Sequence, residues 1–243
     1  MRIKGVLFDK DGTLIDFFSL WLKAATEVIP KLMKELSIDS MPEMKEYLLN
    51  TIGVRDGAVD PNGGLSYKSY GEIAEDIKEA LAEKDVYVDV SRTHKLLVKL
   101  FEEFATGENV QFQTFTPMKE MLTSLKREGI YVGLATADTL HSARVCLEKL
   151  DILEMFDFVG GDDGIMQPKP HPEMFDLFTQ RYKLQPEEVA IVGDTPNDML
   201  FAKQCGAIAI GVLSGVSNKE DLMENGDYII SSVDELLSLL HTI

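Results

Sequence analysis

Five charged residues stand where they could form one site. Asp9 and Asp11 come directly after the first apolar run of the chain. Asp194 and Asp198 follow a later apolar run, and Lys169 lies between two prolines. Carboxylates that crowd together need a counter-charge, because they cannot all stay ionised on their own. An all-oxygen ligand set favours a hard cation, so the pattern predicts a Mg²⁺ site with Lys169 as a second positive charge.

Ordinary turn chemistry is the competing explanation. A single aspartate after a strand usually forms a turn or caps a helix. Four neighbouring residues could each be explained in that way: Asp194, Thr195, Asn197 and Asp198. The charged residues nevertheless come from separate segments that would meet at one edge of a sheet. A shared site is therefore the favoured interpretation.

Short apolar runs alternate with amphipathic segments along most of the chain. The runs predict strands at residues 3–8, 130–135, 156–159, 189–192, 207–210 and 228–230. The amphipathic segments predict helices at residues 118–127, 140–150, 172–182, 196–205 and 233–240. This alternation is typical of a parallel sheet covered on both faces. The predicted fold is α/β, a doubly wound parallel sheet, in which ligands bind beyond the carboxyl ends of the strands.

The alternation is interrupted between residues 16 and 113. This segment predicts helices at residues 17–36, 41–51, 71–82 and 93–105, with a kink or break at Pro30. Residues 53–71 are rich in Gly, Pro, Asn and Asp and predict a loop. We therefore expect a core domain of residues 1–15 and 114–243, with a helical domain of residues 16–113 inserted after the first strand.

Composition narrows the class of protein. The 243 residues include 24 Lys and Arg against 41 Asp and Glu, which gives a net charge of −17, and 45% of them are hydrophobic. Such a chain can form a core, whereas its acidity disfavours nucleic acid and anionic membranes as partners. The longest apolar run, residues 207–213, is far shorter than the ~20 residues that cross a bilayer. Two cysteines are too few for a disulfide framework, and no signal peptide is apparent, so we expect a cytoplasmic protein. The sequence does not indicate its oligomeric state.

Four motifs in order resemble those of the haloacid dehalogenase superfamily. Residues 9–13 read Asp-Lys-Asp-Gly-Thr, which is similar to the first motif, and Thr136 matches the second. Lys169 matches the third motif, and residues 193–198, Gly-Asp-Thr-Pro-Asn-Asp, match the fourth. The resemblance implies a Rossmann-like core with a cap of the C1 type, similar to phosphoglycolate phosphatases.

The resemblance also implies roles for individual residues. Asp9 would attack phosphorus and form an aspartyl-phosphate, while Asp11 would act as general acid and then general base. Mg²⁺ would be held by the Asp9 carboxylate, the Asp11 backbone carbonyl and Asp194, with support from Asp198.

The phosphate group would be held by a second set of residues. Thr136, the backbone N–H of Ala137 and Lys169 would bind its oxygens. Ala137 stands where the family often has Asn. Lys10 stands where a hydrophobic residue is common, and alternation predicts that its side chain points away from Asp9. Residues 55–70 of the inserted segment are candidates for contact with the leaving group, through Asn62, Tyr67 and Lys68, and ordinary loop chemistry explains these residues equally well.

These implications favour a Mg²⁺-dependent phosphomonoester hydrolase that acts on a small phosphorylated metabolite. A sugar phosphomutase similar to β-phosphoglucomutase is the alternative within the enzymes. A phospho-acceptor signalling domain, similar to response-regulator receivers, is the alternative of another class. The large insertion and the spacing of Asp9 and Asp11 disfavour a receiver, and an acid at Asp11 disfavours a dehalogenase. The sequence does not identify the ester.

Overall fold

The computed structural model describes residues 3–16, 18–41, 43–60, 62–108, 110–162 and 164–243. The chain divides into two compact units, which we call the core unit (Met1–Phe17 with Phe112–Ile243) and the insertion unit (Phe18–Gln111). Both borders lie two residues from those that the sequence predicts. Each unit is described by itself below.

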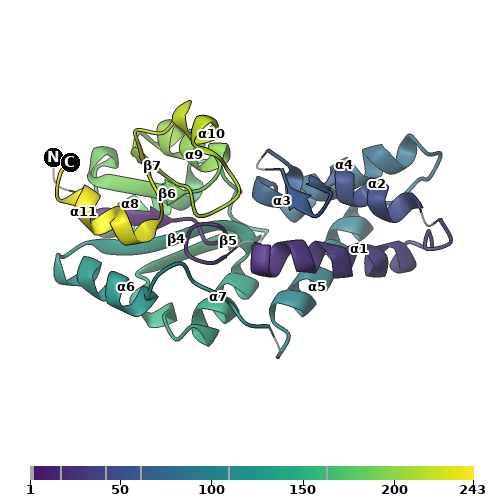
Figure 1. Cartoon of the computed structure of the whole chain (residues 1–243), viewed down its shortest axis with the longest axis horizontal. Coiled ribbons are helices and arrows are strands. Elements are labelled where there is room, and N and C mark those ends of the chain that lie inside the picture. Colours follow the sequence, from purple (N-terminus) through teal and green to yellow (C-terminus); the bar gives the residue numbers. More distant parts are fainter. Residues whose placement is uncertain (1–2, 17, 42, 61, 109, 163) are drawn as a thin grey trace. The chain divides into compact units, whose positions relative to one another are not determined.

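The core unit is built on a six-stranded sheet (Figure 1). The strands are β1 (Gly5–Phe8), β4 (Tyr131–Thr139), β5 (Phe158–Asp162), β6 (Val189–Gly193), β7 (Ile208–Val212) and β8 (Tyr228–Ile230). They pair in parallel in the order β5-β4-β1-β6-β7-β8. The predicted parallel α/β sheet is confirmed. The strand order reverses at β1, which places a switch point for ligand binding at its carboxyl end.

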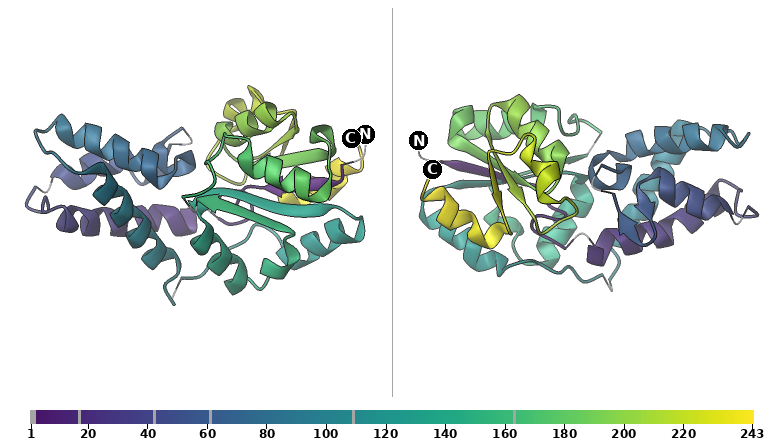
Figure 2. Two further views of the ribbon diagram at one scale, coloured as in Figure 1. Left: turned by 180° about the vertical axis from the view of Figure 1, so that it is seen from behind. Right: turned by 45° about the horizontal axis from the view of Figure 1, so that its top comes forward.

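Helices cover both faces of this sheet (Figure 2). One face carries α6 (Met118–Arg127), α7 (Leu140–Lys149) and α11 (Leu236–Leu240), and the other carries α8 (Glu173–Tyr182), α9 (Pro196–Cys205) and α10 (Lys219–Met223). The alternation of side chains along β1 sorts its apolar residues between the two faces. Val6 and Phe8 pack with the first helix group, and Leu7 packs with the second. Burial on both faces explains why β1 is apolar at every position.

Strand β4 is longer than the sequence predicts. It continues to Thr139, so residues 136–138 lie inside the strand and not beyond its end. Its pairing with β5 shifts between Ala135 and Thr139, where four steps along β4 match two steps along β5. Gly161 lies opposite this bulge, and a Cβ at that position would approach the Asp138 carbonyl oxygen to 2.9 Å. The bulge therefore depends on a glycine in the neighbouring strand.

The insertion unit is mainly helical. A π-helical turn, η1 (Phe18–Leu22), leads into α1 (Lys23–Glu35), and α2 (Glu43–Thr51), α4 (Tyr70–Ala82) and α5 (Val90–Ala105) follow. Of the predicted kink or break at Pro30, the break is wrong, because α1 continues through this residue. Buried residues on both sides of Pro30, including Ile29 and Leu32, hold the helix in place. This packing outweighs the cost of about 3 kcal/mol for an internal proline.

Residues 53–71 contain more structure than the predicted loop. Strands β2 (Val54–Arg55) and β3 (Ala58–Val59) form a hairpin, and α3 (Gly64–Tyr67) follows. Asp56 and Gly57 join the strands with φ values of 51° and 73°. Positive φ at both central residues is the mark of a type I′ turn, which favours Asp-Gly. The sequence therefore held a hairpin signal that the loop prediction overlooked.

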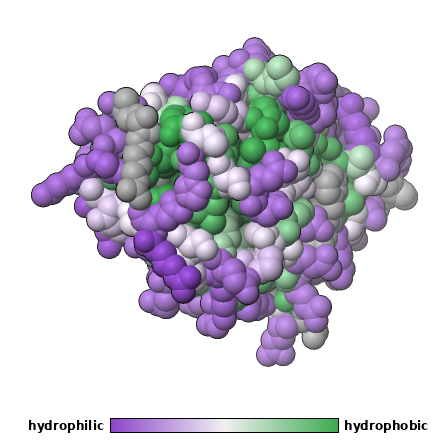
Figure 3. Space-filling view, turned by 60° about the vertical axis from the view of Figure 1, so that its left-hand side comes forward, coloured by the Kyte–Doolittle hydropathy of each residue, from purple (hydrophilic) through white to green (hydrophobic). Residues whose placement is uncertain are grey.

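One side of the molecule is largely hydrophilic (Figure 3). Figure 3 looks onto the side that lies at the left of Figure 1, where hydrophilic residues surround a smaller hydrophobic area. Among the described residues, no helix combines the length and the apolar character that crossing a membrane requires.

Candidate active site

Asp9 is held at the carboxyl end of β1 by the sheet itself. Its backbone N–H donates to the Val192 carbonyl oxygen at 2.8 Å, which continues the register between β1 and β6 by one residue. Asp9 therefore lies beside Gly193, and Asp194 comes next along the chain. A side chain at Gly193 would overlap Asp198, since a Cβ there would lie 2.3 Å from the Asp198 Cβ. The glycine of the fourth motif thus lets the two strand ends and α9 approach closely.

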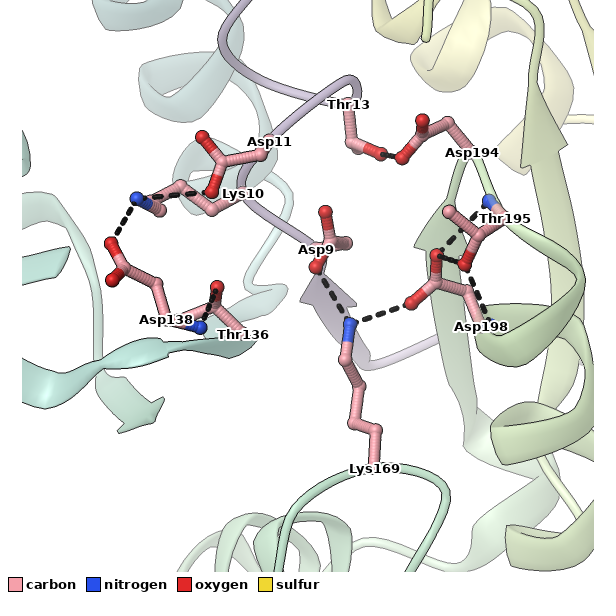
Figure 4. A network of polar contacts seen from close by, with 10 residues as sticks. All are labelled: Asp9, Lys10, Asp11, Thr13, Thr136, Asp138, Lys169, Asp194, Thr195 and Asp198. Carbon is pink, nitrogen blue, oxygen red and sulfur yellow. Dashed lines mark hydrogen bonds and ion pairs between the residues drawn. The ribbon is translucent and has the colours of Figure 1, made fainter. Parts of the chain in front are cut away.

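Lys169 joins two of the carboxylates. Its Nζ lies 2.6 Å from Asp9 Oδ1 and 2.6 Å from Asp198 Oδ1 (Figure 4). The lysine side chain is only 5% exposed. Burial by itself would lower the pKa of Lys169, but Asp198 and Asp9 outweigh that effect and hold the pKa above its usual range. The ammonium group is therefore charged and fixed next to Asp9.

Asp198 has two functions in this arrangement. Its Oδ2 accepts hydrogen bonds from the Thr195 hydroxyl at 2.6 Å and from the Thr195 N–H at 3.1 Å, which makes a capping box at the start of α9. Its Oδ1 binds Lys169. Asp198 therefore caps α9 and also contacts Lys169, as both explanations allow. Asp198 fixes Lys169, and Lys169 fixes Asp9.

Asp194 is enclosed by the loops that follow β1 and β7. Its carboxylate accepts hydrogen bonds from the Val216 N–H at 3.0 Å and from the Thr13 hydroxyl at 3.3 Å. A Cβ at Gly12 would come within 2.2 Å of Asp194 Oδ2, and one at Gly215 within 1.9 Å. Two glycines therefore make room for this carboxylate. The contribution of the loop after β7 was missed from the sequence, where a glycine in a turn gives no specific signal.

Three of the carboxylates form a candidate metal site. Ligand oxygens of Asp9, Asp194 and Asp198 lie within 4.8 Å of one another. Burial raises the pKa of Asp9 to about 7, against the opposing charge of Lys169 and with added repulsion from Asp198. Burial and then Asp9 raise the pKa of Asp194 well above its usual range. Three carboxylates against one ammonium group leave two negative charges in excess, so the cluster could hold a divalent cation.

Two of the phosphate-binding candidates, Thr136 and Ala137, lie on β4. The pairing of Phe8 with Leu134 places Asp9 beside Ala135, so Thr136 and Ala137 come next along the strand. Thr136 is buried, and its hydroxyl accepts a hydrogen bond from the Asp138 N–H at 3.1 Å. In Figure 4, Thr136 lies on the opposite side of Asp9 from Asp198. Asp9 therefore has Thr136 on one side and the other carboxylates of its cluster, Asp194 and Asp198, on the other (Figure 4).

Asp11 is separate from the acidic cluster. Its Oδ2 lies 3.0 Å from Lys10 Nζ, and the same ammonium group lies 2.6 Å from Asp138 Oδ2. Lys10 points away from Asp9, as the alternation predicts (Figure 4). The partnership of Lys10 with Asp138 was missed from the sequence, because the two residues are 128 positions apart.

The candidate residues of the insertion unit have local partners. Lys68 Nζ lies 2.6 Å from Asp76 Oδ2, and the Asn62 N–H donates to Asp60 Oδ1 at 2.9 Å. The side chain of Tyr67 lies outside the described residues.

The comparisons with known proteins agree with the geometry. Residues 3–206 match the family model described as haloacid dehalogenase-like hydrolase. A phosphoglycolate phosphatase from Shigella dysenteriae serotype 1 is 30% identical over 244 residues, which cover 98% of this chain and 92% of that protein. The structure of a predicted phosphoglycolate phosphatase from Haemophilus somnus 129PT is similar, with a TM-score of 0.72, 20% identity and 98% of both chains covered. A β-phosphoglucomutase from Clostridium difficile matches with a TM-score of 0.68 at 18% identity, covering 99% of this chain and 98% of that one.

Proposed function

Because this chain belongs to the haloacid dehalogenase-like hydrolases, we propose that it is a Mg²⁺-dependent phosphomonoester hydrolase for a small phosphorylated metabolite. The observation that supports this proposal most directly is the position of Lys169 Nζ, which lies 2.6 Å from Asp9 Oδ1 and 2.6 Å from Asp198 Oδ1. This contact holds a strand-end carboxylate beside a cluster that could hold a cation. The relatives named phosphoglycolate phosphatase support a phosphatase and make phosphoglycolate the first ester to test.

Asp9 is the proposed nucleophile. Lys169 binds Asp9 Oδ1, which leaves Oδ2 to attack phosphorus. The new bond joins Oδ2 to phosphorus, and the bond from phosphorus to the ester oxygen breaks. Asp11 gives a proton to that oxygen as it leaves. Asp11 then takes a proton from water, whose oxygen attacks phosphorus and releases Asp9 and inorganic phosphate.

The metal site fits this chemistry. The side chains of Asp9 and Asp194, with the backbone carbonyl of Asp11, would hold the ion, and Asp198 would support it by fixing Lys169. The ion supplies positive charge that lets an anionic carboxylate approach an anionic phosphate ester. Thr136, the Ala137 N–H and Lys169 would hold the phosphate oxygens. The oxygen-only donor set favours Mg²⁺ over softer metals.

The insertion unit is the proposed specificity element. The four groups of motif residues lie in the core unit, whereas the insertion begins shortly after the nucleophile loop. We therefore assign the choice of leaving group to residues 55–70 and the attack on phosphorus to the core unit. The protein would act in the cytoplasm on a free metabolite, without nucleic acid or membrane as a partner.

A panel of phosphate esters tests the proposal. Wild-type protein and Asp9→Asn are assayed for release of inorganic phosphate from 2-phosphoglycolate, β-glucose 1-phosphate and p-nitrophenyl phosphate, with Mg²⁺ and after chelation. Mg²⁺-dependent phosphate release that Asp9→Asn abolishes is the expected result. Conversion of the sugar phosphate into an isomer without phosphate release would indicate a phosphomutase. A phosphorylated protein that persists without turnover would indicate a receiver.

A further inference from the structure

Lys10 is a fully buried lysine in the middle of the first motif. Its side chain has no exposed surface, yet its Nζ lies 2.6 Å from Asp138 Oδ2 and 3.0 Å from Asp11 Oδ2. A buried charge is costly unless it is paired. Burial opposes the charge, but Asp11 and Asp138 outweigh it and hold the pKa of Lys10 above its usual range. The ammonium group is therefore a fixed charge between two carboxylates.

Asp138 is itself held by the surrounding backbone. Its Oδ1 accepts a hydrogen bond from the Thr139 N–H at 2.7 Å, and its own N–H donates to the Thr136 hydroxyl. Thr139 caps α7 by accepting a hydrogen bond from the Ser142 N–H. The carboxylate of Asp138 is therefore tied to the bulge of β4 and the start of α7. It is an anchor, and Lys10 links that anchor to Asp11.

We propose that Lys10, anchored by Asp138, is a positioning residue that orients the Asp11 carboxylate for proton transfer to and from the oxygens that leave and attack phosphorus. This inference rests on the proposed function, in which Asp11 exchanges that proton. In Figure 4, Lys10 is joined to Asp11 and Asp138, on the other side of Asp9 from Asp198. Because Asp138 balances the ammonium charge, the pair orients Asp11 without adding net charge beside it.

A purely structural role makes a different prediction. If the ion pair only joined the β1 loop to β4, its loss would affect all esters alike. If Lys10 positions Asp11, its loss matters most when the leaving oxygen needs a proton. The alcohol released from 2-phosphoglycolate is a poor leaving group without that proton, whereas the p-nitrophenolate ion leaves readily. The comparison of these two esters is therefore the decisive measurement.

The experiment uses the full chain and the variants Lys10→Met and Lys10→Met/Asp138→Asn. The double variant removes the buried carboxylate that loses its ammonium partner in Lys10→Met, so it protects the test against loss of the fold. Lys126→Met is the matched control, because Lys126 also pairs with an aspartate, Asp157, in the core unit. Thermal unfolding and circular dichroism establish that each protein is folded, and kcat/KM is measured for both esters.

We expect both Lys10 variants to lose at least about tenfold more kcat/KM with 2-phosphoglycolate than with p-nitrophenyl phosphate, within the 10²–10⁴-fold range of general acid catalysis. The control should change neither value by more than about twofold. Equal losses with both esters in a folded variant, or no loss with either, would overturn the role of Lys10. Failure of the proposed function is recognised separately, because wild-type protein would then release no phosphate or Asp9→Asn would remain active.

Discussion

Replacement of Asp194 by asparagine should stabilise the metal-free protein. Asp194 is 1% exposed and lies with Asp9 and Asp198 in a cluster whose oxygens are within 4.8 Å of one another. Asparagine has nearly the same shape, and its carbonyl oxygen can still accept the hydrogen bond from the Val216 N–H. The substitution therefore removes charge while it keeps most of the packing.

The size of the effect follows from the distances. Two unit charges 4.8 Å apart repel by about 3.5 kcal/mol at an effective dielectric constant near 20. Lys169 already balances part of the charge on Asp9 and Asp198. Loss of a charge-assisted hydrogen bond costs roughly 1 kcal/mol in the other direction. The net gain in the free energy of unfolding should be about 1–2 kcal/mol at pH 8, or roughly 2–8 °C in Tm.

Thermal unfolding with chelator measures the stability of the metal-free protein, and thermal unfolding with excess Mg²⁺ measures the stabilisation by the ion. Mg²⁺ at about 100 times its Kd should stabilise the wild-type protein by about 2.7 kcal/mol, whereas Asp194→Asn should lose most of that response. Asp176→Asn, on the exposed side of α8, is the matched control and should change neither value. A metal-free Asp194→Asn protein that is less stable than wild type by more than about 1 kcal/mol would refute the electrostatic reasoning.

Further predictions concern turnover, specificity and pH. Asp9→Asn should keep the fold and lose phosphatase activity, and steady-state activity within tenfold of wild type, about 1.4 kcal/mol in barrier, would exclude Asp9 as the nucleophile. Lys169→Met should lower kcat/KM for all esters by about 10²-fold or more, and a loss confined to one ester would contradict its role at the phosphate group. Lys68→Ala should change the ranking of esters in a kinetic panel, whereas a uniform large loss would place residues 55–70 in the catalytic machinery. In metal-free protein, burial raises the pKa of Asp9 from 3.8 to about 7, so the folded state binds this proton more tightly than the unfolded state does. The contribution of Asp9 to the free energy of unfolding is therefore greatest at low pH and falls by roughly 2–4 kcal/mol as pH rises from about 4 to 7. The Tm of Asp9→Asn should fall less steeply across that range than the Tm of the wild-type protein.

The sheet and the meeting of the main site residues were accessible from the sequence for one physical reason. Buried parallel strands are continuous apolar runs, and their carboxyl ends share one edge. The positions of Asp9 and Asp194 follow directly once those runs are recognised. Lys169 was harder, because no strand carries it. Its place between two prolines, in the segment between the third and fourth predicted strands, singled it out, and the four-motif resemblance then gave it a role.

Other features depended on packing that a single sequence does not display. Pro30 breaks an isolated helix, but the buried side chains around it keep α1 continuous. The end of β4 was placed too early because its last residues are polar, and the bulge that includes them depends on Gly161 in another strand. The hairpin at Asp56 and Gly57 is different, since its turn signal was present and was outweighed by the loop-like composition around it.

The two lysines of the site show why such a site can operate in a chain with a net charge of −17. Lys169 binds Asp9 and Asp198, and Lys10 binds Asp11 and Asp138. In each case one carboxylate belongs to the β1 loop and the other anchors the lysine from a different element, α9 for Lys169 and β4 for Lys10. In the β1 loop Asp9 belongs to the first group, whereas Lys10 and Asp11 both belong to the second, so one tripeptide supplies members of both groups.

Each group consists of two carboxylates and one ammonium, so each carries a single excess negative charge when it is fully ionised. The surplus beside Asp9 is increased by Asp194, which is where the candidate cation site lies. The group around Asp11 has no such neighbour among the described candidate metal ligands. A cation would therefore be drawn to the carboxylate of the nucleophile and not to the carboxylate of the proton carrier. This difference in charge would let two aspartates two residues apart perform different chemistry, the one as nucleophile and metal ligand, the other as acid and base.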